Sequence, residues 1–376
     1  MQMKQIFKTL YAISAGLFIS ACNNASFDAN PGTVFQQCAQ GRPEVQCQVT
    51  CDDSGSCFSD YNYSVQAKAQ QTDILFVVDN SASMHPEQIR MSTNFRSFMN
   101  SVRNIDYRIG VTTTDVTASP NNGPAFYNGN GAWQDGKLLQ FDDNRPYLDG
   151  SQDAQTEQDL FDSNVRRDET LNCASRNFAP EHCPSGDERG IFASVLNLQN
   201  NPSQWIRPTG HMAIVILSDE DEGSDGVFID PQGRDRPQGF VNHFNKLYPN
   251  KSLAVHSIII RPGDNNCLSA QSAGKLGVFG NVYAQLTGIT GGVLANICAP
   301  EYTSSLQDIG ESASQFREVL PCQPYQNQVE VSFTPDVGNQ VQVIRRLQQR
   351  EILFNGNVPA GTQINLSFRC QQNATN

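Results

Sequence analysis

The stretch DILFVVDNSASM, residues 73–84, decides the fold. Residues 75–78 are apolar without a polar break, which is typical of a strand buried on both faces. The run stops at Asp79, and Ser81 and Ser83 follow at alternate positions, so one carboxylate and two hydroxyls can turn toward one point. Open α/β sheets bind ligands at the carboxyl ends of their strands, and hard oxygen ligands of this kind suit Mg²⁺, Mn²⁺ or Ca²⁺.

Apolar strands and amphipathic helices alternate along most of the chain. Further strands are expected at 107–112, 212–217, 253–260 and 293–294. Helices are expected at 85–103, 155–165, 191–198, 240–248, 282–287 and 302–316. This alternation predicts the α/β class, with a doubly wound, mostly parallel sheet, and 376 residues are enough to bury a full core.

The D-x-S-x-S pattern at 79–83, directly after an apolar strand, resembles the metal-ion-dependent adhesion site of von Willebrand factor A (vWA) domains. The Thr-Gly-Gly turn at 290–292 resembles the entry to their last strand. The resemblance covers residues 67–320, with an insertion at about 117–187. It implies a vWA/Rossmann-like fold and a bound divalent cation, Mg²⁺ first with Mn²⁺ or Ca²⁺ as alternatives. It also implies a protein or surface ligand that offers a carboxylate to that cation.

The resemblance adds two metal residues. The strand at 212–217 runs into Ser218 and Asp219, as in the family's strand that ends Thr/Ser-Asp, so Asp219 is expected to hold the cation. The position of the family's metal-binding threonine falls on Glu188, which departs from the pattern. A carboxylate there would bind the cation more tightly and depend less on a partner's acid. Two alternatives stay open: Glu188 as a carboxylate favoured by a helix N-terminus, and a threonine at 112, 113 or 114 as the third donor.

The formal net charge of −12, from 38 acidic and 26 basic residues, argues against nucleic acid and anionic lipid surfaces as partners. Part of this acidity lies in the loop after Asp219. Its acidic residues are Glu220, Asp221, Glu222 and Asp225. Most of them are expected to be solvated, with a second Ca²⁺ site as the alternative.

Residues 1–22 predict a lipoprotein signal peptide. Two lysines precede an apolar run at 10–19 that is too short to span a membrane as a mature helix. Residues 19–22 resemble a bacterial lipobox, in which Cys22 would be lipidated and become the new N-terminus. A plain signal peptide cut near Ala21 is the alternative. We therefore expect a lipid-anchored protein of the bacterial cell envelope, at the outer membrane and facing the periplasm or the exterior.

The cysteine count supports export. Eleven cysteines leave ten when Cys22 is set aside, an even number that suits five disulfides in an oxidising compartment. Four of them, in a tether and cap at 23–66, allow three connectivities: Cys38, Cys47, Cys51 and Cys57. The other disulfide candidates are Cys173, Cys183, Cys267, Cys298, Cys322 and Cys370. A zinc site in the cap would lack both a paired repeat and a nearby histidine.

Two segments fall outside the α/β alternation. Residues 117–152 are rich in Gly, Asn and Asp, and we expect a β-hairpin there, near the metal face. From Cys322 onward the pattern alternates with period two, at 329–333 and 364–368, with turns between. This predicts a small β-unit at 321–376 beside the α/β domain.

The favoured function is an interaction module that binds its partner through a divalent cation. One alternative is a structural scaffold of the envelope in which the cation only stabilises the fold, which a glutamate in the metal shell favours. Another is a haloacid-dehalogenase-like phosphatase, but this chemistry needs a second acid two residues after Asp79, where Ser81 stands. The sequence also lacks a G-x-S-x-G elbow, a P-loop and histidines at metal-ligand spacing, so an enzyme is not expected.

Overall fold

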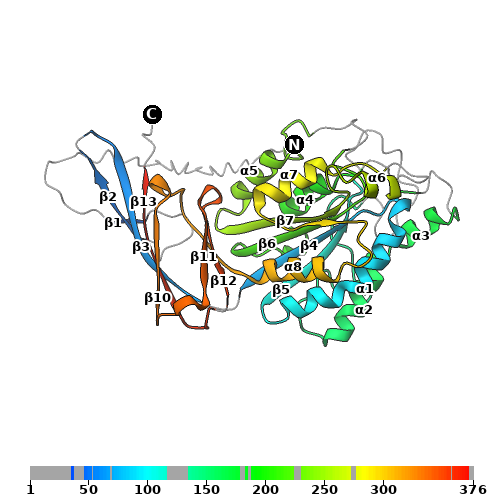
Figure 1. Ribbon diagram of the computed structural model, residues 1–376, viewed down its shortest axis with the longest axis horizontal. Helices are drawn as coiled ribbons and strands as arrows, with labels where there is room; N and C mark the ends of the chain where they lie inside the picture. The colour runs from blue at the N-terminus through cyan, green and yellow to red at the C-terminus, as the bar shows by residue number, and fades with distance from the viewer. Residues whose placement is uncertain are drawn as a thin grey trace, which may run out of the picture.

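Figure 1 shows a computed structural model in which the chain forms two parts, an α/β domain and a β-sandwich, that lie end to end. The residues described are 35–37, 46–52, 54–67, 70–116, 134–177, 183–184, 188–223, 230–271, 277–356 and 358–371. Cys22, with the lipobox-like residues, and Cys38 lie outside them. Among the described residues no helix combines the length and the apolar character that a membrane span needs.

A five-stranded parallel sheet forms the centre of the α/β domain. Its strands are β4 (Gln71–Val78), β5 (Asp106–Thr113), β6 (Gly210–Leu217), β7 (Lys251–Ile259) and β8 (Leu294–Asn296). They lie in the order β5-β4-β6-β7-β8, and all neighbours are parallel. The central strand β4 is buried from residue 72 to 78, which explains its unbroken apolar run.

Helices cover both faces of this sheet (Figure 1). They are α1 (His85–Val102), α2 (Ala154–Val165), α3 (Asp168–Ala174), α4 (Gly190–Asn200), α5 (Pro237–Leu247), α6 (Asn265–Gln271), α7 (Asn281–Thr290) and α8 (Thr303–Ser314). Phe76 of β4 packs against Phe95 of α1 and Phe161 of α2. Leu75 and Val77 point the other way, into the core beneath α4, α5 and α7. The doubly wound, parallel α/β class expected from the sequence is confirmed.

The strand order creates a topological switch point between β4 and β6. From β4 the chain crosses to β5 on one side, and it later returns to β6 on the other. Doubly wound folds bind ligands in the crevice outside the carboxyl ends of the strands at such a point. These ends are level, because Val78 pairs with both Thr113 and Leu217. The residues that follow Val78 therefore lie at the crevice.

The second part is a sandwich of two antiparallel sheets. The larger sheet has the order β1-β2-β3-β13-β10 and contains β1 (Phe35–Gln37), β2 (Gln46–Cys51), β3 (Cys57–Gln66), β13 (Gln363–Gln371) and β10 (Val329–Thr334). The smaller sheet has the order β11-β12-β9 and contains β11 (Gln342–Arg346), β12 (Glu351–Asn355) and β9 (Phe316–Val319). Side chains from both sheets, such as Leu366 and Phe354, share one apolar core.

The N-terminal cap and the C-terminal β-unit, expected as two appendages, are joined in one sheet. β3 pairs with β13 along nine residues, from Phe58↔Gln371 to Gln66↔Gln363. Each strand alternates apolar and polar residues, so one face of each needs cover, and pairing places Tyr61 and Phe368 in a stacked contact. The sequence pattern shows that each strand has an apolar face but does not show which strand it pairs with.

Short connections and disulfides complete the fold. The 3₁₀ turns are η1 (Ala82–Met84), η3 (Pro202–Gln204), η4 (Tyr325–Asn327), η5 (Gly338–Gln340) and η6 (Leu347–Gln349). The described disulfides are Cys51–Cys57, Cys173–Cys183, Cys267–Cys298 and Cys322–Cys370. The six candidates beyond the cap are therefore bonded in consecutive pairs.

The sandwich meets the α/β domain at the amino ends of the strands. Arg346 donates hydrogen bonds to the carbonyls of Thr290 (3.4 Å) and Gly291 (3.3 Å), and Gln349 donates to Ile289 (2.9 Å). These carbonyls end α7, where a cation is favoured by the helix dipole. The junction thus lies at the opposite edge of the sheet from the switch-point crevice (Figure 1).

One local expectation is wrong. The helix expected at 302–316 ends at Ser314, because Gln315 is extended and the chain enters β9. Of the insertion in which a hairpin was expected, residues 117–133 lie outside the described residues, and residues 134–152 run along the edge of β5, with a bridge between Ile109 and Leu148. This edge would otherwise expose unpaired main-chain groups.

Candidate functional site

Asp79 is fixed at the switch point by three hydrogen bonds. Its main-chain N–H donates to the carbonyl of Leu217 (3.0 Å), which continues the pairing of β4 with β6. Its Oδ1 accepts from the N–H of Ser81 (2.8 Å), and its Oδ2 accepts from the hydroxyl of Ser218 (2.7 Å). The carboxylate is fully buried. It is therefore held in one orientation by the end of β6 and by the turn that follows β4.

The two serine hydroxyls and Asp219 form a chain of oxygens beside it. Ser81 Oγ lies 2.9 Å from Ser83 Oγ, and Ser83 Oγ donates to Asp219 Oδ1 at 3.1 Å. Mg²⁺ binds oxygens at about 2.0–2.1 Å in an octahedron, so neighbouring ligands stand about 2.9 Å apart. These oxygens already have the spacing of adjacent ligands of such an ion.

Glu188 is brought to the same place from the start of α4. Its side chain is 1% exposed, and its Oε2 has no hydrogen-bond partner among the described residues. The charge that acts on it most strongly is that of Asp79, followed by those of Glu220 and Asp219. Of the alternative donors, Thr112 turns its hydroxyl to the carbonyl of Lys137 (2.8 Å). Of Glu188 and the three threonines, Glu188 is thus the residue with a buried side-chain oxygen that lacks a hydrogen-bond partner among the described residues.

Burial makes this cluster unfavourable when its carboxylates are all ionised. Burial raises the pKa of Asp79 to about 7, while hydrogen bonds from Ser81 and Ser218 act in the opposite direction. Burial also raises the pKa of Glu188 well above its usual range, and the neighbouring charges, with Asp79 first, add to this. A divalent cation would reverse the balance by compensating the charges.

The insertion supports the motif from one side, which the sequence did not predict. Thr170 of α3 donates its hydroxyl to the carbonyl of Asn80 (2.7 Å), and the Asn80 amide donates to Glu169 (3.0 Å). Gln88 of α1 donates to the carbonyl of Asp79 (2.9 Å) and to Thr170 (3.0 Å). The chain that carries the two serines is therefore held between α1 and α3.

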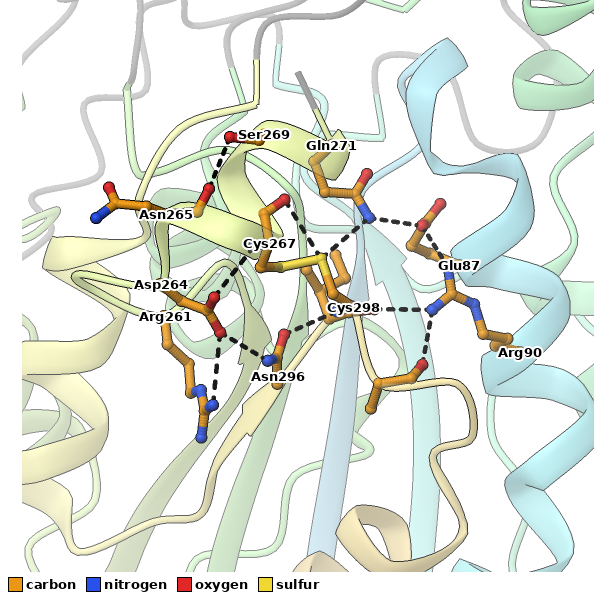
Figure 2. Close-up of a disulfide and its surroundings, with 12 residues drawn as sticks. Glu87, Arg90, Arg261, Asp264, Asn265, Cys267, Ser269, Gln271, Asn296 and Cys298 are labelled. Carbon is orange, nitrogen blue, oxygen red and sulfur yellow. Dashed lines mark hydrogen bonds and ion pairs between the residues drawn. A yellow bond between two sulfur atoms is a disulfide. The ribbon is translucent and has the colours of Figure 1, made fainter. Parts of the chain in front are cut away.

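A disulfide holds the other side of this edge, as Figure 2 shows. Cys267 of α6 is bonded to Cys298, which follows β8. The amide of Gln271, also on α6, donates to Glu87 in the first turn of α1 (2.9 Å), and Arg90 donates to the same carboxylate (2.7 Å). Arg90 also donates to two main-chain carbonyls after β8 (3.0 and 2.8 Å). The start of α1 is thus linked to α6 and to the end of β8.

Two residues of the acidic loop contradict the expectation of solvation. Asp221 and Glu222 are 8% and 6% exposed, because their carboxylates turn inward to main-chain N–H groups of helix ends. From the sequence, Ser218 was assigned no role beyond the end of a strand, but in the structure its hydroxyl orients Asp79. A serine before the strand-end aspartate was the available signal.

The donor set fits a hard cation only if hydroxyls take part. In the described part of the chain, no three His, Cys, Asp or Glu side chains are grouped so that they alone could hold a metal ion. The contacts seen among the five residues expected from the sequence are pairwise: Asp79 with Ser81, Ser81 with Ser83, and Ser83 with Asp219, while the charges of Asp79 and Asp219 act on the buried Glu188. Two hydroxyls with carboxylates, all oxygen donors, suit Mg²⁺ or Mn²⁺ better than zinc.

Comparisons with known proteins add little to this. No family model and no curated protein matches the sequence. The pilus adhesin SpaC from Lactobacillus rhamnosus GG is matched over 92% of this chain and 45% of its own, at 9% identity and a TM-score of 0.30. A von Willebrand factor type A structure from Catenulispora acidiphila is matched over 85% and 62%, at 10% identity and a TM-score of 0.35. Manganese-loaded TRAP from Plasmodium vivax is matched over 66% and 75%, at 13% identity and a TM-score of 0.30.

These sequence identities and TM-scores are too low to carry an argument about function. The chain spans about half the length of the SpaC adhesin. The comparisons assign no family, and the doubly wound fold rests on the strand order described above.

Proposed function

We propose that this protein is an interaction module of the cell envelope that binds a protein or surface ligand through a divalent cation. Asp79, Ser81, Ser83, Asp219 and Glu188 would hold the ion, with Mg²⁺ first and Mn²⁺ or Ca²⁺ as alternatives. One observation carries the proposal: hydroxyl and carboxylate oxygens stand at ligand spacing at the switch point, beside a buried Glu188 oxygen that has no hydrogen-bond partner among the described residues.

The residues would make different contributions to cation binding. Ser81 and Ser83 supply neutral oxygens, and Asp79 stays oriented by Ser218 while its charge faces the site. Glu188 brings a further charge to the same point. The cation, when bound, would compensate these charges and offer an open position to an oxygen of the partner, for which a carboxylate is chemically suitable.

The position of the site suits a module displayed from a surface. The β-sandwich, which contains the most N-terminal strands described, meets the sheet at the amino ends of its strands, whereas the site lies at the carboxyl ends (Figure 1). Cys22 precedes the first strands of the β-sandwich in the sequence, so an anchor there would be joined to the sandwich rather than to the α/β domain. Lipidation of Cys22, the outer membrane and a periplasmic or exterior location belong to the proposal, supported by the lipobox-like residues and the paired cysteines.

A second function is favoured by one observation. Glu188 is buried and gives the site a further carboxylate of its own, so the cation could be satisfied without a partner. In that case the protein is an envelope scaffold that the cation only stabilises. We propose no enzymatic activity, because Ser81 stands where a dehalogenase-type phosphatase needs its second acid.

The two functions are separated by a capture experiment. The purified protein, immobilised through an added C-terminal tag, is exposed to solubilised cell envelopes with Mn²⁺ or with a chelator, beside Ser83→Ala. The proposed module retains a defined protein or surface component with Mn²⁺ only, and Ser83→Ala retains far less. Retention that ignores both the chelator and the variant contradicts the module. Empty captures together with a metal-dependent rise in melting temperature support the scaffold.

A further inference from the structure

The loop after β6 carries two neighbouring acids that end in different helices. Asp221 and Glu222 follow Asp219 by two and three residues, and both are buried. Neither belongs to the five oxygen donors of the proposed cation site. A buried carboxylate is costly unless it accepts hydrogen bonds, so the bonds of these two show what they do.

Glu222 caps the N-terminus of α4. Its two carboxylate oxygens accept from the N–H groups of Ile191 (2.6 Å) and Phe192 (2.9 Å). The residue before the helix, Arg189, provides no side-chain cap. The first N–H groups of a helix have no partner within the helix, so Glu222 supplies the missing acceptor oxygens from another segment.

Asp221 does the same for α7. Its oxygens accept from the N–H of Val282 (3.0 and 3.1 Å) and from the N–H of Tyr283 (3.3 Å). Gly280, which precedes the helix, has no side chain to offer. The hydroxyl of Tyr283 in turn accepts from the N–H of Gly190 at the start of α4 (3.0 Å). The starts of α4 and α7 are therefore locked to one loop and to each other.

This loop joins the two ends of the proposed cation site. Its first residue after Ser218 is Asp219, whose carbonyl accepts from the N–H of Val278 (3.0 Å). Its last described residue, Gly223, donates its N–H to the carbonyl of Glu188 (2.8 Å). Glu188 itself lies two residues before α4 begins. The distance between the Asp219 and Glu188 carboxylates is thus set by where the loop docks.

We propose that Asp221 and Glu222 are positioning residues of the cation site, which hold Glu188 and Asp219 at a fixed separation by docking the loop on the starts of α7 and α4. The inference rests on the proposed function, because it concerns the same site. Outer partners that orient metal ligands commonly contribute tenfold to a hundredfold to metal affinity. Loss of either cap should therefore weaken the ion without removing any donor oxygen.

The test is a Mn²⁺ titration of the purified protein by calorimetry, well below its melting temperature. Glu222→Ala and Asp221→Ala each remove one cap, and Glu222→Gln keeps an oxygen that can accept from an N–H group. The matched control is Asp153→Ala, because Asp153 caps α2 through Gln155 (3.0 Å) and Thr156 (3.1 Å). It removes the same kind of bond outside the loop.

We expect Glu222→Ala and Asp221→Ala to bind Mn²⁺ about tenfold to a hundredfold more weakly than the wild type. Glu222→Gln keeps one acceptor oxygen, so it should bind more tightly than Glu222→Ala but more than twofold more weakly than the wild type. Asp153→Ala should stay within about twofold of the wild type although it also loses a helix cap. If either alanine variant does not fold, Glu222→Gln and Asp221→Asn are compared instead, and each should be weaker than Asp153→Ala.

The inference is overturned if loop variants bind as the wild type does, and the proposed function then still stands. A wild type that binds no Mn²⁺ overturns both, so the two failures are told apart. A uniform loss that includes Asp153→Ala also overturns the inference, since the effect would then follow stability rather than position.

Discussion

Replacing Glu188 by glutamine should raise the stability of the metal-free protein and lower the gain from metal. Glu188 is 1% exposed, with one carboxylate oxygen that has no hydrogen-bond partner among the described residues. Burial and the charges of Asp79, Glu220 and Asp219 all act against its ionised form. Glutamine keeps the shape and removes the charge. Each unit by which burial raises a carboxyl pKa opposes folding at neutral pH by about 1.4 kcal/mol, and glutamine, which does not ionise, avoids this cost. The expected increase in unfolding free energy is therefore on the order of one to a few kcal/mol.

The same change removes one ligand charge from the cation site. If the ion binds a hundredfold more weakly, the stabilisation that saturating metal gives falls by up to about 2.7 kcal/mol. The assay is a melting curve in chelator and in a series of Mg²⁺ and Mn²⁺ concentrations. Glu188→Gln should melt above the wild type in chelator by about 2–4 °C for each kcal/mol, and rise less on addition of metal.

The matched control is a buried glutamate with partners. Glu351 is ion-paired with Arg317 (3.2 Å) and Arg346 (3.7 Å), so Glu351→Gln should melt below the wild type in chelator and keep the full metal-induced rise. The reasoning about Glu188 is refuted if Glu188→Gln melts at or below the wild type in chelator and its metal-induced rise equals that of the wild type.

Three further results are expected. Burial raises the pKa of Glu222 to about 8, so the unfolded chain binds fewer protons than the folded protein between about pH 4.5 and 8. The wild type should therefore lose stability relative to Glu222→Gln as pH rises, by on the order of 5 kcal/mol over that range, in unfolding titrations at several pH values. Phe76→Ala should cost about 3–5 kcal/mol in denaturant unfolding, because Phe76 packs against three other phenylalanines; an effect below 1 kcal/mol contradicts this core. The double variant Cys267→Ser, Cys298→Ser opens a disulfide of sequence separation 31 and should lower the unfolding free energy by about 3–4 kcal/mol; an unchanged denaturation midpoint would argue against the bond.

The sheet was predictable, and the site could be proposed, because one local pattern bears on both. An unbroken apolar run must be buried on two faces, and the polar residues after it must lie at its carboxyl end. Asp79, Ser81, Ser83 and Asp219 follow from this logic together with the family resemblance. Glu188 was assigned to the site because the position of the family's metal-binding threonine falls on it in the sequence. Its burial and the effect of the Asp79 charge on it agree with that assignment.

The rest depended on contacts between segments far apart in sequence. β3 and β13 each show an alternating pattern, but 301 residues separate Ser64 from the Asn365 that it contacts, and no local signal pairs them. Asp221 and Glu222 looked like solvated loop acids because their partners are main-chain N–H groups, which every sequence contains. The insertion was expected as a hairpin, yet its described residues cover the edge of β5.

If Asp79 and Glu188 hold a divalent cation together, binding of that ion depends on both side chains. We would first titrate the purified protein with Mg²⁺, Mn²⁺ and Ca²⁺ by calorimetry, beside Asp79→Ala and Glu188→Ala. We expect the wild type to bind one ion and both variants to lose this binding. Loss in Asp79→Ala alone would move the third donor to the threonines at 112–114. A wild type that binds none of the three ions would contradict the proposal.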